Sequence, residues 1–246
     1  MEQEIISGKN PVLAALQSGR TIHKILISEQ LQPNMKKKLY NLGKKVTVIQ
    51  KVPKNKLDRV AKGNHQGVVA YVAPYAYASL EDLFQRASKA NEAPFFILLD
   101  ELEDPHNLGS IIRTADATGA HGVIIPKRRS VGLTEAVAKT AAGALEHVPV
   151  ARVTNVAYTI DELKERNVWV VGTDAEGDED YRSLDGTLPI AIVIGNEGKG
   201  ISRLVKEKCD WTVSLPMKGK LSSLNASVAC SILLYEVFRK RHPLGE

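Results

Sequence analysis

Residues 215–236, LPMKGKLSSLNASVACSILLYE, change from a strand-like to a helical pattern, and the interpretation of the rest of the chain starts from this stretch. The stretch begins as the end of a strand, continues through a loop of Pro, Gly, Lys and Ser, and becomes a long apolar helix. The helix prediction rests on Leu224, Val228, Ile232, Tyr235 and Phe238, which recur every three or four residues.

Three polar residues stand at the start of this helix. Ser222, Ser223 and Asn225 are suited to capping its first turn, whose backbone N–H groups otherwise lack partners. A polar loop between a buried strand and a buried helix is also where α/β folds bind ligands. The stretch alone favours an ordinary capped strand–loop–helix, and it does not by itself establish a site.

Upstream of this stretch, the chain alternates apolar strands with helical patterns. From Pro94 onward we expect strands at 95–100, 122–126, 148–153, 168–173, 188–195 and 211–215, and helices at 109–118, 135–145, 158–166 and 201–208. The strands lack polar alternation, which is typical of strands buried on both faces of a parallel sheet. The pattern predicts a doubly wound α/β domain over residues 94–246.

The first 75 residues form a separate predicted α/β unit. Helices are expected at 11–17, 33–42 and 53–61 and strands at 22–27, 46–49 and 67–72, followed by a linker and helix over 76–93. Lysines cluster at Lys36–Lys38, and Lys54, Lys56 and Arg59 form a second basic group. Such groups can contact RNA phosphates, although a cluster of this size is more often a solvated helix face.

Composition narrows the possible classes of protein. The chain has 33 Lys+Arg against 28 Asp+Glu, a net charge of +5, which permits a polyanionic partner without requiring one. Cys209 and Cys230 show no metal-ligand spacing, so we expect two buried thiols in a reducing compartment and no metal site. The sequence shows neither a signal peptide nor an apolar run of about 18 residues, so we expect a soluble cytoplasmic protein.

Two further stretches follow strand ends, where ligands bind in such sheets. The first places Asn107 at the mouth of a helix and Arg113 on it. Arg113 offers five fixed donors to an oxyanion or phosphate, but the local sequence favours an ion pair with Asp100, Glu103 or Asp116.

The second stretch is a glycine-rich loop, G-N-E-G-K-G over 195–200. Its spacing matches neither the dinucleotide fingerprint nor the P-loop, which argues against a dinucleotide-dependent oxidoreductase. Glu197 lies within it, and Thr173 ends another strand. Together the three stretches supply an apolar slot, exposed backbone and one each of Arg, Glu, Ser and Asn. The six histidines are scattered and form no paired ligand spacing or Ser/His/Asp set.

The three stretches, taken in order, resemble the motifs of a known enzyme family. N-L-G-S-I-I-R-T-A (107–115), I-V-I-G-N-E-G-K-G-I (192–201) and S-L-P-M-x-G-x-x-S-S-L-N-A-S-V-A (214–229) resemble the motifs of the SpoU, or TrmH-like, branch of the SPOUT RNA 2′-O-methyltransferases. Residues 6–11, with H-Q-G-V-V at 65–69, resemble the ribosomal protein L30e-like substrate-binding domain found in this family, most closely in its 23S rRNA guanosine 2′-O-methyltransferases.

The resemblance implies a fold, a cofactor and a set of site residues. It implies a trefoil knot in the C-terminal domain, S-adenosyl-L-methionine (SAM) as cofactor, and a homodimer through the knotted domain in which Arg113 of one subunit reaches the other's site. It assigns catalysis to Asn107, Arg113, Glu197, Ser223 and Asn225. It assigns cofactor binding to Thr173, Gly195, Gly198, Leu215, Met217 and Leu224.

The implied reaction is methyl transfer to a ribose 2′-hydroxyl in RNA, with a guanosine of 23S rRNA as the expected target. The resemblance gives Arg113 the role of proton acceptor, whereas its chemistry favours phosphate anchoring and stabilisation of alkoxide charge. A tRNA ribose 2′-O-methyltransferase remains an alternative. So does an RNA-binding or ribosome-assembly module with an inactive transferase domain.

Overall fold

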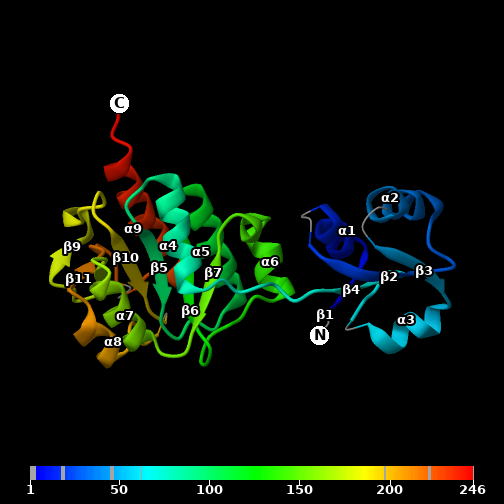
Figure 1. Ribbon diagram of the computed structural model, residues 1–246. Helices are drawn as coiled ribbons and strands as arrows, with labels where there is room; N and C mark the ends of the chain where they lie inside the picture. Colours follow the sequence, from blue (N-terminus) through cyan, green and yellow to red (C-terminus); the bar gives the residue numbers. More distant parts are fainter. Residues whose placement is uncertain are drawn as a thin grey trace. The chain divides into compact units, whose positions relative to one another are not determined.

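The computed structural model describes residues 4–17, 20–44, 47–61, 63–196, 198–220 and 223–245. The chain divides into two compact units, Met1–Ala76 and Tyr77–Glu246 (Figure 1). Each unit has its own sheet and its own core, and each is described here by itself.

The N-terminal unit is a four-stranded mixed sheet with helices on both faces. The sheet order is β1-β4-β2-β3, in which β4 is antiparallel to β1 and β2, and β2 is parallel to β3. Its elements are β1 (Glu4–Ser7), α1 (Lys9–Gln17), β2 (Ile22–Ser28), α2 (Pro33–Gly43), β3 (Val48–Val52), α3 (Lys54–Val60) and β4 (Val68–Val72).

Alternate side chains of β2 fill two cores in this unit. Ile25 and Ile27 pack in the core that contains residues of α1 and α2, whereas Leu26 packs with Leu57 of α3. Successive side chains of a strand point to opposite faces. The sheet therefore holds α1 and α2 on one face and α3 on the other.

The C-terminal unit is a seven-stranded sheet in which every pair of neighbouring strands is parallel. The order is β7-β6-β5-β10-β8-β11-β9. All residues of β5 and β10 are buried, as expected of central strands in a parallel sheet. The strands are β5 (Phe95–Leu99), β6 (Gly122–Pro126), β7 (Val150–Val153), β8 (Trp169–Thr173), β9 (Glu179–Asp180), β10 (Ile190–Ile194) and β11 (Trp211–Ser214).

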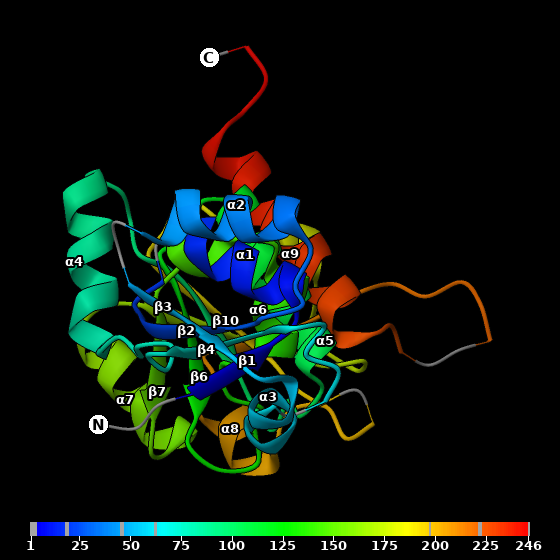
Figure 2. The same ribbon diagram turned by 90° about the vertical axis from the view of Figure 1, so that its right-hand side faces the viewer.

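Helices cover both faces of this sheet (Figure 2). Phe95, Ile97 and Leu99 pack in one core with α5, α6 and α9, while Phe96 and Leu98 pack in a second core with α4, α7 and α8. The helices are α4 (Leu80–Ala90), α5 (Pro105–Ala117), α6 (Glu135–Ala141), α7 (Val156–Glu165), α8 (Arg203–Lys208) and α9 (Ala226–Arg241), with short 3-10 turns at Ala144–Glu146 and Tyr181–Ser183.

The expected α/β class with a parallel C-terminal sheet is confirmed. The trefoil knot, the L30e-like character of the first unit and the functional division at 75 and 93 stay predictions. Among the described residues, no helix is both long and apolar enough to cross a membrane, and no group of three His, Cys, Asp or Glu side chains could hold a metal ion.

Several predicted boundaries were wrong for identifiable reasons. The helix expected at 109–118 begins at Pro105, because Asp104 caps it by accepting a hydrogen bond from the His106 N–H at 3.0 Å. The helix expected at 135–145 ends at Ala141, because Ala142 and Gly143 adopt positive φ values of 51° and 99°. Strands β1 and β9 were not predicted.

The apolar stripe proposed for the last helix was also wrong. Val228 and Tyr235 are 48% and 52% exposed, and Leu224 precedes the helix. The buried residues instead include Cys230, Leu233, Leu234 and Val237. This helix is apolar on more than one face, so its periodicity alone does not identify the side that packs on the sheet.

Candidate active site

A cavity of about 300 Å³ lies beyond the carboxyl ends of three neighbouring strands, β10, β8 and β11. These strands bring together segments that are far apart in the sequence. The lining residues are Thr173, Asp174, Ala175, Ile194, Gly195, Asn196, Gly198, Lys199, Gly200, Val213, Leu215, Met217, Ser223, Leu224, Ala226, Ala229 and Leu233. All six predicted cofactor-binding residues belong to this set, as does Ser223.

The glycine-rich loop forms one wall of the cavity by folding back on itself. The Asn196 N–H donates to the Gly200 carbonyl at 3.0 Å, and the Gly200 N–H donates to the Asn196 carbonyl at 2.8 Å. A Cβ on Gly195 would lie 2.1 Å from the Gly200 carbonyl carbon, so only glycine permits this approach. Gly200 has φ +68° and open space on its Cβ side.

Side-chain bonds tie this loop to the neighbouring strand ends. The Gly198 N–H donates to Asn196 Oδ1 at 2.9 Å, and Asn196 Nδ2 donates to the Glu101 carbonyl at 3.3 Å. The buried Asp100 carboxylate accepts a hydrogen bond from the Ser202 N–H at 2.7 Å. The wall is therefore fixed at both ends by groups that follow β5 and β10.

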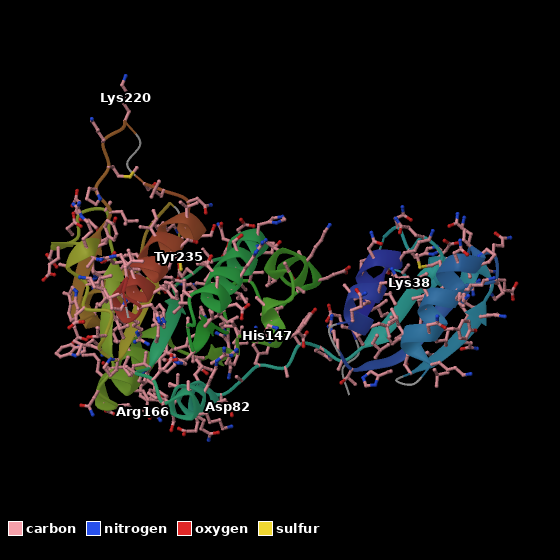
Figure 3. All side chains as sticks on the ribbon, turned by 90° about the horizontal axis from the view of Figure 1, so that it is seen from above. Lys38, Asp82, His147, Arg166, Lys220 and Tyr235 are labelled. Atoms are coloured by element: carbon pink, nitrogen blue, oxygen red, sulfur yellow. The ribbon has the colours of Figure 1, made fainter. Side chains whose placement is uncertain are left out.

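The stretch between β11 and α9 supplies the opposite wall and extends away from the sheet, with Lys220 at its far end (Figure 3). Asn225 caps α9, because its Oδ1 accepts hydrogen bonds from the N–H groups of Ser227 and Val228 at 3.0 and 3.4 Å. Ala226 and Ala229, one turn apart, then line the cavity. Their small side chains leave room where the helix begins.

Polar groups at the end of β8 complete the lining. Thr173 Oγ1 donates to the Val193 carbonyl at 2.9 Å. Burial opposes ionisation of Asp174, but hydrogen bonds from Lys206 Nζ, at 2.6 Å, and from the Glu176 N–H outweigh it and lower the pKa of Asp174. The cavity therefore has an ionised carboxylate at its edge at neutral pH.

The residues predicted on α5 do not line this cavity. Asn107 lies buried in the first turn of α5, and Arg113 lies exposed further along the same helix. Of the ion pairs between described residues, none involves Arg113, so the expected pairing with Asp100, Glu103 or Asp116 is not found. The helix packs against α9, where Thr114 Oγ1 and Ser231 Oγ are 3.0 Å apart. Glu197 and Ser222 lie outside the described residues.

Sequence reasoning missed several lining residues. Asp174 and Ala175 directly follow the predicted Thr173, and Asn196 and Lys199 lie between the predicted glycines. Their position at strand ends was the available signal. Ala226 and Ala229 gave a weaker signal, because two alanines three residues apart in a helix usually indicate close packing of that helix against a neighbour.

Both cysteines are free thiols; Cys230 is buried as expected, whereas Cys209 is only half-buried. Burial raises the pKa of both thiols, with a smaller contribution from Asp210 at Cys209, whose pKa reaches about 12. Neither residue lines the cavity.

Comparison with known proteins places both units in one family. The SpoU rRNA Methylase family matches residues 94–235, and a family described as RNA 2'-O ribose methyltransferase substrate binding matches residues 5–78. A TrmH family tRNA/rRNA methyltransferase of Bacillus subtilis strain 168, YacO, is 58% identical over 100% of this chain and 99% of its own length. A protein of the same description from Staphylococcus aureus strain MSSA476 is 53% identical over the full length of both chains.

Solved structures agree with these matches. The SpoU methyltransferase AviRb from Streptomyces viridochromogenes, in complex with AdoMet, has a TM-score of 0.79 at 30% identity, covering 97% of this chain and 90% of that chain. An AdoMet-bound rRNA methyltransferase from Sinorhizobium meliloti has a TM-score of 0.70 at 28% identity, and the match covers 99% of this chain and 88% of that chain. The chain therefore belongs to the TrmH/SpoU family of RNA methyltransferases.

Proposed function

We propose that this protein transfers the methyl group of SAM to a ribose 2′-hydroxyl in RNA, with a guanosine of 23S rRNA as the substrate. One observation supports the proposal above the others. The six residues predicted to bind the cofactor come from two of the motifs and from the strand end at Thr173, and they line a single cavity at the carboxyl ends of β10, β8 and β11.

The cavity has the chemistry that SAM requires. Leu215, Met217 and Leu224 provide apolar surface for a purine ring, and the closely approaching backbone at Gly195 offers amide groups for its edge. Asp174 and Ser223 supply polar atoms for hydroxyl and ammonium groups. The volume lies at the lower end of the roughly 300–1,000 Å³ that is usual for ligand pockets. The residues present therefore fit the cofactor.

SAM, when bound, supplies a methyl group on a positively charged sulfur. The work left to the protein is to position a weak nucleophile and to stabilise the charge that develops on it. In this proposal Arg113 binds the phosphate beside the target ribose and stabilises the developing alkoxide. Ser223 lines the cavity, and two residues later the helix cap holds the Asn225 side chain in place.

The position of Arg113 favours a site shared between two copies. Arg113 does not line the cavity of its own chain, and the helix it belongs to packs on α9. On α9, Val228 and Tyr235 expose apolar surface (Tyr235 is labelled in Figure 3). Exposed apolar faces are typical of interaction surfaces. In the proposed homodimer, this face is covered by the second copy, and Arg113 reaches the second copy's cavity. Asn107, Glu197, Ser223 and Asn225 are the residues proposed to orient Arg113 and the ribose.

The choice of 23S rRNA rests on the H-Q-G-V-V sequence and on the N-terminal unit, which matches a substrate-binding family. A tRNA ribose is the second candidate, because the relatives are described as tRNA/rRNA methyltransferases. An inactive RNA-binding module is less consistent with a sequence that keeps Asn107, Arg113, Glu197 and Asn225.

Two measurements test the proposal together. Calorimetric titration with SAM should show one site per chain, and incubation with methyl-labelled SAM should transfer label to a 23S rRNA transcript and not to tRNA. Binding without transfer to any RNA would favour the inactive module. No binding of SAM would contradict the proposed cofactor.

A further inference from the structure

A second cavity, of about 310 Å³, lies in the N-terminal unit. It shares no lining residue with the site described above, and it includes one lysine, Lys54, of the second basic group predicted from the sequence. Its lining comes from four segments: Lys9 at the start of α1; Ser28, Gln30, Leu31 and Gln32 between β2 and α2; Lys54 at the start of α3; and Asn64, His65, Gln66 and Gly67 before β4.

The topology of the sheet explains why these segments meet. Strands β1, β2 and β3 run in one direction and β4 in the other. The carboxyl ends of the first three strands and the beginning of β4 therefore lie along one edge of the sheet. Such an edge is the usual place for a ligand in an α/β fold.

The loop before β4 is held in an unusual conformation. Gln66 and Gly67 have φ values of +46° and +83°, and the Val68 N–H donates to the His65 carbonyl at 2.8 Å. Positive φ is rare for a residue with a long side chain. Strain of this kind concentrates at binding sites, where the surroundings must hold it in place.

His65, which is itself part of the lining, supplies that support. Its Nδ1 accepts a hydrogen bond from the Gly67 N–H at 2.9 Å, so the ring proton lies on Nε2 and is donated to Asp58 Oδ1, also at 2.9 Å. The Ser28 N–H donates to the Gly67 carbonyl at 2.8 Å. The loop is thereby joined both to α3 and to the end of β2.

The lining has a definite chemical character. It contains two lysines, four side-chain amides and no carboxylate. The side chains of Lys9, Lys54, Gln30 and Gln32 make no hydrogen bond or ion pair with any other part of the described chain. Ammonium groups bind phosphate, and amides can both donate to and accept from the edge of a base. Leu31 adds apolar surface.

We propose that this cavity binds one unpaired nucleotide of the RNA substrate, with Lys9 and Lys54 on its phosphates and Gln30 and Gln32 on its base. The inference rests on the RNA activity proposed above. Sequence-specific RNA recognition uses unstacked bases in loops and bulges. A cavity lined by amides can hold such a base, whereas a flat basic surface contacts only the backbone.

The test compares charge-changing and charge-neutral variants on a labelled 23S rRNA transcript, over roughly 50 to 200 mM salt. Gln30→Ala combined with Gln32→Ala should weaken binding about tenfold, as expected for two lost hydrogen bonds, and should leave the salt dependence unchanged. Lys54→Gln should weaken binding and reduce the slope of log K against log salt by roughly 0.7. Lys44→Gln, at an exposed lysine directly after α2 that is outside the lining and outside both predicted basic groups, is the matched control and should change neither quantity.

The outcomes separate this inference from the proposed function. SAM binding and methyl transfer by the unaltered protein test the proposed function alone. If that protein methylates the transcript while the Gln30/Gln32 and Lys54 variants bind it as Lys44→Gln does, the cavity is not an RNA site. Addition of GMP, AMP, CMP or UMP on the order of 1 mM should not displace the RNA. Displacement by one of them at micromolar concentration would assign the cavity to a free nucleotide and overturn the inference.

Discussion

Replacing Gly195 by alanine should remove SAM binding without unfolding the protein. The new Cβ would lie 2.1 Å from the Gly200 carbonyl carbon and 2.2 Å from the Ile201 nitrogen. Carbon atoms pack at about 3.5–4.0 Å, so the backbone at Gly200 must move by more than about 1 Å. Both neighbours are backbone atoms, and no side-chain rotation can relieve the contact.

The cost of this movement follows from what holds the loop. Overpacking costs about 1–3 kcal/mol, and separating Asn196 from Gly200 removes two hydrogen bonds of about 1 kcal/mol each. The loop therefore opens, and the cavity loses the wall that contains Asn196, Gly198 and Lys199. If about 3 kcal/mol of this cost falls on the bound state, the Kd for SAM rises at least a hundredfold.

Calorimetric titration with SAM measures this change directly, and circular dichroism reports whether the sheet remains folded. The control is Gly219→Ala, because a Cβ there meets nothing within 4 Å. It should bind SAM as the unaltered protein does. A Gly195→Ala protein whose affinity for SAM lies within about threefold of the original would refute the assignment of this cavity.

Three further predictions concern single side chains. Arg113→Ala should reduce methyl transfer at least about a hundredfold. SAM affinity and melting temperature should stay unchanged, because Arg113 is exposed and does not line the cavity. Normal turnover by this variant would show that Arg113 has no part in the mechanism. Asp174→Asn should cost no more than about 1 kcal/mol of unfolding free energy at neutral pH. The pKa of Asp174 is lowered, so the stability that the ionised Asp174 contributes is lost as pH falls below about 4. The denaturation curves of Asp174→Asn and the unaltered protein should therefore converge in acid. A difference in unfolding free energy that does not change with pH would contradict the pairing with Lys206. Burial raises the pKa of Cys209 to about 12, so iodoacetamide at neutral pH should label it only after unfolding, and rapid labelling of the native protein would show that the thiol is accessible.

The parallel α/β architecture could be predicted from the local pattern because the central strands β5 and β10 are apolar at every position. The apolar strands at 95–100 and 188–195 have no alternation, and only burial on both faces explains this. Helix starts were less predictable. The start of α5 depends on a cap from Asp104 and on Pro105, which resemble an ordinary turn until the chain beyond them is seen to be helical.

The packing of α9 could not be obtained from its sequence. Val228 and Tyr235 follow the same three-to-four-residue spacing as Cys230, Leu233 and Val237, yet the first pair is exposed and the other three are buried. Which face is inside depends on contacts with α5 and the sheet, and the contact with α5 brings together Thr114 and Ser231, which are 117 positions apart. The exposed face is the surface that the proposed homodimer would cover.

The sequence could indicate those parts of the candidate site that are formed by backbone at glycines and strand ends. Glycines and strand ends are visible in a sequence, and all six cofactor-binding predictions line the cavity. The position of Arg113 relative to that cavity depends on tertiary structure and, in the proposed dimer, on a second chain. Its exact role in catalysis therefore could not follow from spacing along one helix.

The measurement that tests the central claim most directly maps the methylated position on RNA. An unmodified 23S rRNA transcript and an unmodified tRNA pool are incubated with the protein and SAM, and alkaline hydrolysis then reveals each linkage that a 2′-O-methyl group protects. The account predicts protection at a single guanosine of the 23S rRNA, lost when Arg113 is replaced by alanine. Protection in tRNA alone, or methylation on bases with no protected linkage, would contradict it.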